Sequence, residues 1–416
     1  MTLPLPALPR FGGTPLFADR VRPIGQLTAP PLDVFFSLVR PMPAGTGWPE
    51  GSHVPQIAEA APDVVQQLEA ALADLHETRH VIACANACVG LVALAELLGR
   101  PHENDPAEVI LPSFTYAGLP HLVQWSGHLP RFCDAAESTH ALCPEAVRAA
   151  INDRTAMILG VHQVNSPCAI DELEAISAET GVPLIFDAVH GLYNTHKGRP
   201  IGNFGRAEVF SLHATKILNG FEGGYITTNE DALATKLRRF LHEGELPGDP
   251  LPQMGMNGRL PPVHAAFALA GVPEIPAACE RNRQRYLRYR QGVASIPGLS
   301  IFAYPDNNER FNYEFSILEV GPAFGCSRDT LVELLLEDNT RARAYYGPAV
   351  HETAHRPPEV PRPSLPVTEA IAQRFVQLPV GEHVSLDDID KICMRFAQIH
   401  ALRDQLNHPP SAGNIA

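Results

Sequence analysis

The chain has 416 residues, of which 45% are hydrophobic and 19% are charged. These fractions are typical of a well-packed globular protein and argue against general disorder. The 46 acidic residues outnumber the 32 basic ones and give a formal net charge of −14 at pH 7. Nucleic acids and anionic membranes both bind basic surfaces, so we expect neither as the main partner. A small anionic ligand stays compatible with this charge, because it needs only one local positive pocket.

The sequence contains no segment typical of export or membrane insertion. No apolar run reaches the roughly 18–20 residues of a membrane-spanning helix. Residues 1–10 alternate leucine with proline and lack the basic and apolar regions of a signal peptide. The eight cysteines are scattered over the chain without the spacing of a disulfide framework. We therefore expect a cytoplasmic protein with reduced cysteines.

Residues 1–61 are dense in proline, with eleven prolines before Gln56. Such a segment cannot form long helices, so we predict an extended arm that lies over the body of the protein or over a partner subunit. The first helix is predicted to begin at Pro62, which suits the first helical position. Apolar residues at helical spacing follow it, from Val65 to Leu75.

Short apolar segments then alternate with amphipathic ones over residues 80–241. The predicted strands are 80–85, 108–111, 129–133, 156–161, 183–186, 207–212 and 224–228, and the predicted helices are 89–98, 116–125, 144–151, 170–180 and 233–241. This alternation predicts an α/β fold with a mainly parallel sheet covered on both faces. Catalytic groups are then expected where the strands end and in the loops that follow. After Arg259 the pattern changes to a helix-rich stretch and then to mixed strands and helices.

One lysine lies in a setting that favours chemistry. The segment Phe210-Ser211-Leu212-His213-Ala214-Thr215-Lys216 ends a predicted strand, and Glu222-Gly223-Gly224 follows. Burial lowers the pKa of an amine and makes it a nucleophile for Schiff-base formation. Ser211 is placed to hydrogen-bond a phosphate, and the paired glycines allow a ligand to approach the backbone. By spacing alone, an ordinary lysine on a loop is an equally good interpretation.

An aspartate ends the preceding predicted strand, in the segment Ile185-Phe186-Asp187-Ala188-Val189-His190. A carboxylate in this position can hold the protonated ring nitrogen of a pyridoxal cofactor. Taken alone, an aspartate at the end of a strand is more commonly a cap of the next turn. Because Asp187 and Lys216 follow successive strands, the pair favours the cofactor interpretation.

The motifs Asp-x-x-His, Ser-x-His-x-Thr-Lys and Glu-Gly-Gly resemble those of the DegT-type sugar aminotransferases, which depend on pyridoxal 5′-phosphate (PLP). The resemblance runs from about residue 62 to about residue 400, with the motifs in the family's order. It implies the fold of PLP enzymes of fold type I, with a mainly parallel seven-stranded sheet sandwiched by helices. We expect a large PLP-binding domain at 62–260 and a smaller C-terminal α+β domain at 261–416, after the arm at 1–61.

The resemblance also implies a role for each matching residue. Lys216 would form the internal aldimine and then move a proton between the cofactor and the substrate carbon. Asp187 would pair with the pyridine nitrogen, and His190 would lie near the ring hydroxyl. Ser211 would bind the cofactor phosphate. Tyr116, which ends the motif Pro-Ser-Phe-Thr-Tyr, would stack on the face of the ring.

The segment Asn86-Ala87-Cys88-Val89-Gly90-Leu91 corresponds to the family's phosphate loop. Backbone N–H groups of Ala87 and Cys88 at a helix N-terminus bind phosphate without a particular side chain. The family usually has threonine where this chain has Cys88, so we expect weaker phosphate anchoring. Asn257 lies in a Gly-Met-Asn-Gly-Arg-Leu segment that, in the family, reaches the neighbouring subunit's cofactor. It therefore implies a homodimer with shared active sites, although Pro261-Pro262 departs from the family pattern.

The resemblance implies a PLP-dependent aminotransferase that converts a keto group of a nucleotide-linked (deoxy) sugar to an amine, with glutamate or glutamine as the donor. Two alternatives stay open: an aminocyclitol or other non-sugar natural-product ketone as acceptor, and a PLP-binding regulator without turnover. A dehydratase is disfavoured, because the family's dehydratases replace the lysine with histidine. His76, His80, Cys84 and Cys88 are each four residues apart, but a strand is predicted at 80–85, so we expect no metal.

Overall fold

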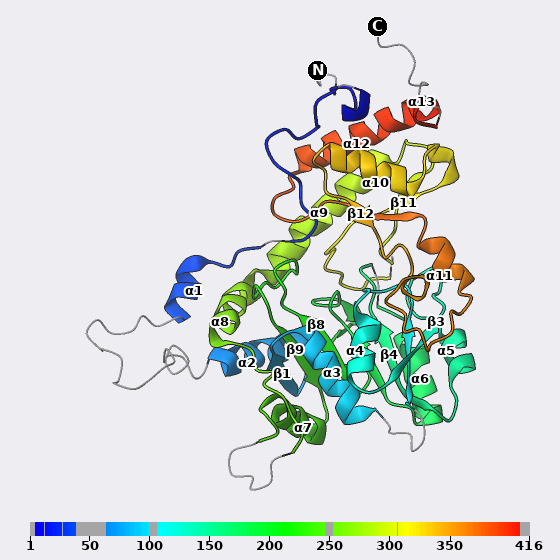
Figure 1. Cartoon of the computed structure of the whole chain (residues 1–416). Helices are drawn as coiled ribbons and strands as arrows, with labels where there is room; N and C mark the ends of the chain where they lie inside the picture. The colour runs from blue at the N-terminus through cyan, green and yellow to red at the C-terminus, as the bar shows by residue number, and fades with distance from the viewer. Residues whose placement is uncertain are drawn as a thin grey trace, which may run out of the picture.

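The computed structural model describes residues 5–11, 13–26, 28–38, 64–99, 106–165, 167–245, 253–305 and 307–407. Figure 1 shows a body built on a large sheet, with a smaller part above it. The predicted helix start at Pro62 lies outside the described residues, and α2 is described as Val64–His76. No helix among the described residues is long and apolar enough to cross a membrane.

The body contains a seven-stranded sheet in the order β1-β9-β8-β5-β4-β2-β3. Its strands are β1 (His80–Cys84), β2 (Glu108–Pro112), β3 (Leu129–Cys133), β4 (Thr155–Val161), β5 (Leu184–Asp187), β8 (Ala207–Ser211) and β9 (Gly224–Thr228). The five strands from β8 to β3 are parallel to one another, and β9 is antiparallel to both β8 and β1. The predicted mainly parallel sheet of seven strands is therefore confirmed, and the α/β fold class with it.

The strand register brings the predicted site to one edge of this sheet. Ser211, the last residue of β8, pairs with Gly224, the first residue of the antiparallel β9. Gly224 also pairs with Cys84, the last residue of β1. Asp187 ends the neighbouring parallel strand β5. The phosphate loop, the lysine loop and the aspartate thus leave the sheet at the same edge, as expected for the carboxyl ends of parallel strands.

Two layers of helices cover the sheet (Figure 1). On one face, apolar side chains of α2, α5 (Pro144–Ala150), α6 (Ile170–Thr180) and α8 (Pro262–Gly271) share a core with the strands. On the other face, α3 (Ala87–Leu98), α4 (Leu119–Trp125) and α7 (Asp231–Leu241) do the same. The strands are buried on both sides, which explains why they appear as continuous apolar runs in the sequence.

Local capping moves two helix starts from their predicted positions. α3 begins at Ala87, two residues earlier than predicted, because the Asn86 side chain accepts a hydrogen bond from the Val89 N–H as an N-cap. α4 begins at Leu119, three residues later than predicted, with Gly118 at its N-cap and Pro120 in the first turn. Tyr116 consequently lies in the turn before α4.

The smaller part contains the four-stranded antiparallel sheet β10-β11-β13-β12. Its strands are β10 (Leu299–Ile301), β11 (Ile317–Val320), β12 (Arg343–Ala344) and β13 (Phe375–Gln377). Its helices are α9 (Ile275–Val293), α10 (Arg328–Glu337), α11 (Pro366–Ile371), α12 (Leu386–Ala401) and α13 (Arg403–Asn407). A separate β-hairpin, formed by β6 (Thr195–His196) and β7 (Arg199–Pro200), lies between β5 and β8 along the chain. A core cluster that joins Phe114 of the body to Phe315 and Tyr345 of the smaller part holds the two parts together.

The described part of the N-terminal arm packs on both parts of the protein. Leu8 and Phe17 belong to the core of the smaller part, and buried Arg22 forms an ion pair with Asp388 of α12 at 3.0 Å. Helix α1 (Leu32–Leu38) lies beside α8, with the rings of Phe35 and Phe267 5.4 Å apart. Helix α8 also packs against α2 in the core of the body. The division of the chain at residue 260 stays a prediction.

We predict that Gly224→Ala destabilises the protein by about 1–3 kcal/mol, because a Cβ at this position would lie 2.5 Å from the Ala87 nitrogen and force α3 away from β9. Urea-induced unfolding measures this change. Gly321→Ala is the control, since its Cβ would meet nothing nearer than 3.4 Å. Equal stability of the two variants would contradict the inferred contact between α3 and β9.

Candidate active site

Lys216 lies in the loop between β8 and β9, at the sheet edge where the strand ends converge. Its side chain is only 13% exposed, and burial lowers the pKa of its amine. The carboxylates of Glu314 and Asp187 oppose this shift, while the Arg343 guanidinium adds to it. The lysine predicted to act as the nucleophile is therefore a largely buried amine, as nucleophilic catalysis requires.

His190 connects this lysine to the smaller part of the protein. Its Nδ1 lies 3.1 Å from Lys216 Nζ and 2.8 Å from Glu314 Oε2. Its Nε2 lies 3.3 Å from the hydroxyl of Tyr346. Burial lowers the pKa of His190 and raises that of Tyr346. The expected place of His190 near the ring hydroxyl of the cofactor stays a prediction, and Glu314 was not predicted. The sequence offers only one sign of Glu314, namely that an acidic residue stands between the aromatic residues Tyr313 and Phe315.

Asp187 is 4% exposed, and burial raises the pKa of its carboxyl to about 6. A hydrogen bond from the Val189 N–H and the charge on Lys216 act in the opposite direction. A buried carboxylate with so few partners is stabilised by any cation that comes to it. The protonated ring nitrogen of PLP is such a cation, so the site fits the role expected for Asp187.

The N-terminus of α3 fits a phosphate group. The first N–H groups of a helix, here those of Ala87 and Cys88, have no acceptor within the helix. Burial raises the pKa of the Cys88 thiol, and the charges of Asp187 and Glu222 add to this rise, so the helix start faces the same region as Asp187. Ser211 stands opposite on the neighbouring strand end, where its hydroxyl accepts a hydrogen bond from the His213 N–H at 3.2 Å.

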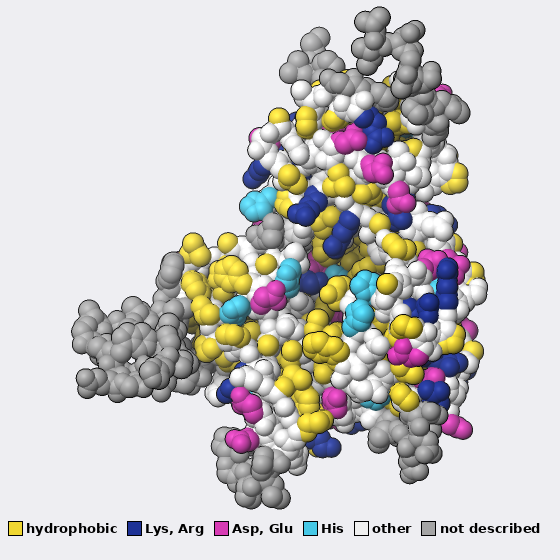
Figure 2. Space-filling model, in the orientation of Figure 1, with side chains coloured by type: hydrophobic (Ala, Val, Ile, Leu, Met, Phe, Trp, Pro, Cys, Tyr) yellow, Lys and Arg dark blue, Asp and Glu magenta, His cyan; other side chains and the backbone are white. Residues whose placement is uncertain are grey.

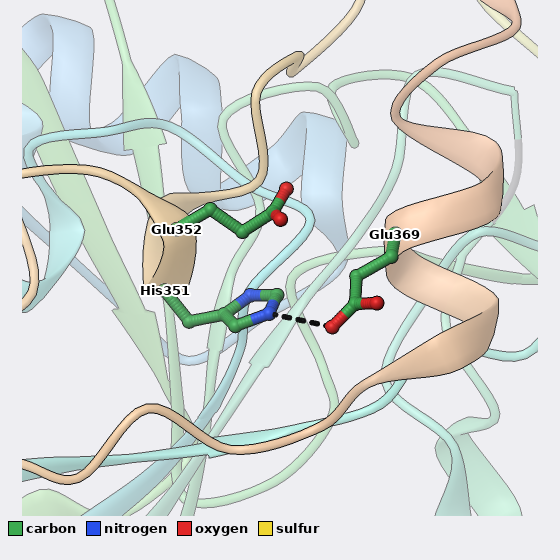
Figure 3. Close-up of side chains that lie close together, drawn as sticks. All are labelled: His351, Glu352 and Glu369. Carbon is green, nitrogen blue, oxygen red and sulfur yellow. Dashed lines mark hydrogen bonds and ion pairs between the residues drawn. The ribbon is translucent and has the colours of Figure 1, made fainter.

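Tyr116 is 58% exposed in the turn after β2, and the structure does not bring it into contact with Lys216, Asp187 or His190. The start of the Tyr116 loop is fixed by hydrogen bonds among Ser113, His351 and Glu369, which we call the clamp. Ser113 Oγ lies 2.7 Å from His351 Nδ1 and accepts a hydrogen bond from the His351 N–H at 2.9 Å. On its other side, His351 Nε2 lies 3.3 Å from Glu369 Oε1 (Figure 3). The clamp ties the Tyr116 loop to the smaller part of the protein.

His351, Glu352 and Glu369 also lie close enough together to be considered as metal ligands (Figure 3). Both ring nitrogens of His351 already have partners, Ser113 and Glu369. Glu352 forms an ion pair with Arg362 at 2.7 Å. The cluster is therefore explained by contacts within the protein, and we assign no metal to it.

Asn257 lies in a segment beside the phosphate loop, because the carbonyl of the next residue, Gly258, accepts a hydrogen bond from the Ala85 N–H at 2.7 Å. Asn257 itself forms a β-bridge with His242, and its side chain accepts a hydrogen bond from Arg259 Nε at 3.3 Å. The Asn257 residue is exposed. Within one chain the structure brings Lys216, Asp187 and His190 together and leaves Asn257 at the surface.

Figure 2 shows a hollow in the molecular surface between the body and the smaller part, with Lys, Arg and His side chains around it. Arg343 of β12 is exposed, and its charge lowers the pKa values of both Lys216 and His190. Its Nε donates to Gln377 Oε1 at 2.6 Å. Among the described residues, no carboxylate forms an ion pair with this guanidinium.

Comparison with known proteins agrees with this geometry. The model of the DegT/DnrJ/EryC1/StrS aminotransferase family matches residues 59–397. The chain belongs to this family. It is a PLP-dependent aminotransferase, and the fold and reaction class expected from the sequence are confirmed.

Several solved structures share the fold. DesI, determined in the presence of its TDP-sugar product, has 32% identity and a TM-score of 0.84, with 96% of this chain and 98% of DesI covered. DesV of S. venezuelae, in complex with a ketimine intermediate, has 25% identity and a TM-score of 0.73, with 81% and 89% covered. Helicobacter pylori PseC, an aminotransferase of pseudoaminic acid biosynthesis, has 18% identity and a TM-score of 0.79, with 91% and 100% covered, a likeness of fold alone.

The raised pKa of Asp187 predicts a pH-dependent stability of the cofactor-free protein. The folded carboxyl takes up its proton near pH 6 and the unfolded one near 3.8, so stability from this group is present below pH 4 and is lost as the pH rises through 6. Asp187→Asn removes the titration. Its stability relative to wild type should therefore rise by about 2–3 kcal/mol between pH 4 and pH 7.

Urea unfolding of both proteins at the two pH values measures this difference. Asp153→Asn, a change on the exposed surface, is the control and should show no such rise. A difference between Asp187→Asn and wild type that stays constant with pH would mean that Asp187 is ionised in the folded protein throughout this range.

Proposed function

We propose that this protein aminates the keto group of a nucleotide-linked (deoxy) sugar, with PLP as cofactor and glutamate or glutamine as amino donor. The observation that carries the proposal is the convergence of a largely buried lysine, a buried aspartate and a helix N-terminus at one sheet edge. A lysine nucleophile, a partner for a ring cation and a phosphate cradle are the three features that PLP needs. DesI, which was solved with a TDP-sugar product, supports the nucleotide-linked acceptor.

Each of these residues has a distinct task in the proposal. When bound, PLP supplies the electron sink that allows an amino group to be taken from the donor and given to the ketone. Lys216 Nζ holds and moves the proton, a task that the lowered pKa of its buried amine favours. Asp187 holds the ring nitrogen in its protonated form. The backbone N–H groups of Ala87 and Cys88, with the hydroxyl of Ser211, bind the phosphate.

Two exposed groups suit the remaining parts of the ligands. In the described part of the chain, the Arg343 guanidinium is bonded through its Nε to Gln377, which leaves its two terminal nitrogens for a carboxylate. This arrangement supports an amino acid as the donor. Tyr116 has its ring exposed beside the site and is assigned to stack on the cofactor. The clamp of Ser113, His351 and Glu369 sets the position of the Tyr116 loop.

An absorbance experiment tests the first half-reaction. The purified protein supplied with PLP should show the visible band of lysine-bound cofactor, and glutamate or glutamine should remove this band. Lys216→Ala should bind PLP without that band. Lys197→Ala is the matched control, because Lys197 is exposed and pairs with Asp171 on the surface. A wild-type protein without the visible band would contradict the cofactor assignment.

The second half-reaction identifies the acceptor. Protein that has received the amino group is mixed in turn with a nucleotide-linked keto sugar, the free keto sugar and an aminocyclitol ketone. We expect the nucleotide-linked sugar to restore the visible band fastest. Recovery with the aminocyclitol ketone alone would favour the alternative acceptor. Failure of every ketone after a successful first half-reaction would favour a PLP-binding protein without turnover.

We also propose a homodimer in which each subunit completes the other's active site. Exposed apolar side chains of α1, α8 and the lysine loop gather on one side of the molecule: Leu32, Val34, Val263 and Phe221. Figure 2 shows hydrophobic side chains spread over the surface around α1 and α8. Phe221 is only five residues from Lys216, so a subunit that covers this face would approach the site. Asn257, which no contact directs at its own chain's lysine, is assigned to the partner's cofactor.

A complementation experiment tests the shared site. Lys216→Ala and Asn257→Ala homodimers should each be severely impaired in transamination. In a shared site, a mixed dimer contains one intact Lys216 with an intact Asn257 from the other chain. Co-expression of the two variants should therefore restore about a quarter of wild-type activity. Activity no greater than the sum of the two single variants would contradict the sharing of sites.

A further inference from the structure

Glu314 is a buried carboxylate inside the site that the proposed roles leave unused. It is 2% exposed and lies in the segment between β10 and β11, so it comes from the smaller part of the protein. Its Oε2 lies 2.8 Å from His190 Nδ1, and its Oε1 lies 3.9 Å from Lys216 Nζ. Oε1 has no hydrogen-bond partner among the described residues. Burying a carboxylate costs free energy, so a buried carboxylate beside Lys216 indicates a functional role.

The protein holds Glu314 in place through its backbone. The Glu314 N–H donates to Asn312 Oδ1 at 2.9 Å, and its carbonyl accepts from the side chain of buried Gln26 in the N-terminal arm. Asn312 Nδ2 in turn donates to the carbonyl of His190 at 2.9 Å and to that of Leu192 at 2.8 Å. The same asparagine therefore fixes both the segment that carries Glu314 and the turn that carries His190.

The contact between His190 and Glu314 shows which ring nitrogen of the histidine carries the proton. An ionised carboxylate can only accept, so a 2.8 Å contact with Glu314 requires the proton of His190 on Nδ1. Nε2 of the neutral ring is then an acceptor, and the Tyr346 hydroxyl at 3.3 Å can donate to it. Lys216 Nζ, 3.1 Å from Nδ1, lies beside this same N–H group.

We propose that Glu314 is a positioning residue: its carboxylate fixes the proton of His190 on Nδ1, so that Nε2 faces Tyr346 as an acceptor and Nδ1–H faces the amine of Lys216. The inference rests on the proposed function and deepens it, because it concerns the surroundings of Lys216, the residue that acts on the cofactor there. Glu314 touches neither substrate nor cofactor in this assignment, and it acts through the histidine. It also places a negative charge beside Lys216 Nζ, which favours the protonated form of that nitrogen.

The charged and titratable groups around this pair come from several elements. They are Lys216 of the lysine loop, Asp187 of β5, Arg343 of β12, Tyr346 after β12, Tyr304 after β10 and Cys279 of α9. Asp187 acts on Lys216 in the same direction as Glu314, and Arg343 acts in the opposite direction. A test of Glu314 must therefore compare variants that leave these groups unchanged.

The first test is the pH titration of the visible absorbance of the PLP-loaded protein. Glu314→Gln keeps the shape of the side chain and removes its charge. The protonated form of Lys216 Nζ in the PLP-loaded protein therefore loses stabilisation. The absorbance midpoint should fall by about one pH unit or more. Glu319→Gln is the matched control, since Glu319 of β11 lies near Arg374 and Ser300, away from the site. A Glu314→Gln midpoint equal to that of the control would overturn the proposal.

The second test uses the wild-type protein and does not depend on the folding of a Glu314 variant. Nitrogen NMR of protein labelled with ¹⁵N-histidine reports which ring nitrogen carries the proton, and loss of a signal in His190→Gln assigns His190. We expect a protonated Nδ1 and a bare Nε2. A protonated Nε2 with a bare Nδ1 would overturn the proposal. This measurement stands even if PLP does not bind, so failure of the proposed function is distinguished from failure of the role of Glu314.

Discussion

The site depends on keeping the amine of Lys216 away from water and near two buried carboxylates. Burial lowers the pKa of the amine, while Asp187 and Glu314 both oppose the shift. Asp187 ends a strand of the body, whereas Glu314 comes from the smaller part. The electrostatic balance at the lysine therefore exists only when both parts are packed together. The shared core of Phe114, Phe315 and Tyr345 is thus a functional requirement as well as a structural one.

The sheet explains why the cofactor groups meet. Parallel strands end at one edge, and the reversed strand β9 begins at that same edge, so Gly224 lies between the ends of β8 and β1. Its lack of a side chain lets α3 start directly against the strand, 2.5 Å from where a Cβ would stand. A phosphate held at that helix start is necessarily near Ser211. The identity of residue 88 is secondary in this arrangement, because the backbone supplies the N–H groups.

The smaller part contributes more to the site than its sequence motifs indicate. Tyr346 follows β12, and its hydroxyl lies 3.3 Å from His190 Nε2. His351 is bonded to Ser113, at the base of the Tyr116 loop. Even the proline-rich arm takes part, because Gln26 holds the backbone of Glu314. These contacts link segments more than a hundred residues apart, which spacing in the sequence cannot reveal.

The sequence by itself determined the order of strands and helices, the seven-stranded sheet and the family, because these follow from local periodicity and from motifs within a few residues of one another. It also indicated Lys216 and Asp187 as neighbours, since successive parallel strands end at the same edge. The tertiary structure alone decided that Glu314 and His190 meet beside Lys216, that Asn257 is exposed, and that His351 bonds to Ser113. The physical reason is that side-chain direction and long-range packing set these contacts, and neither has a local signal in the chain.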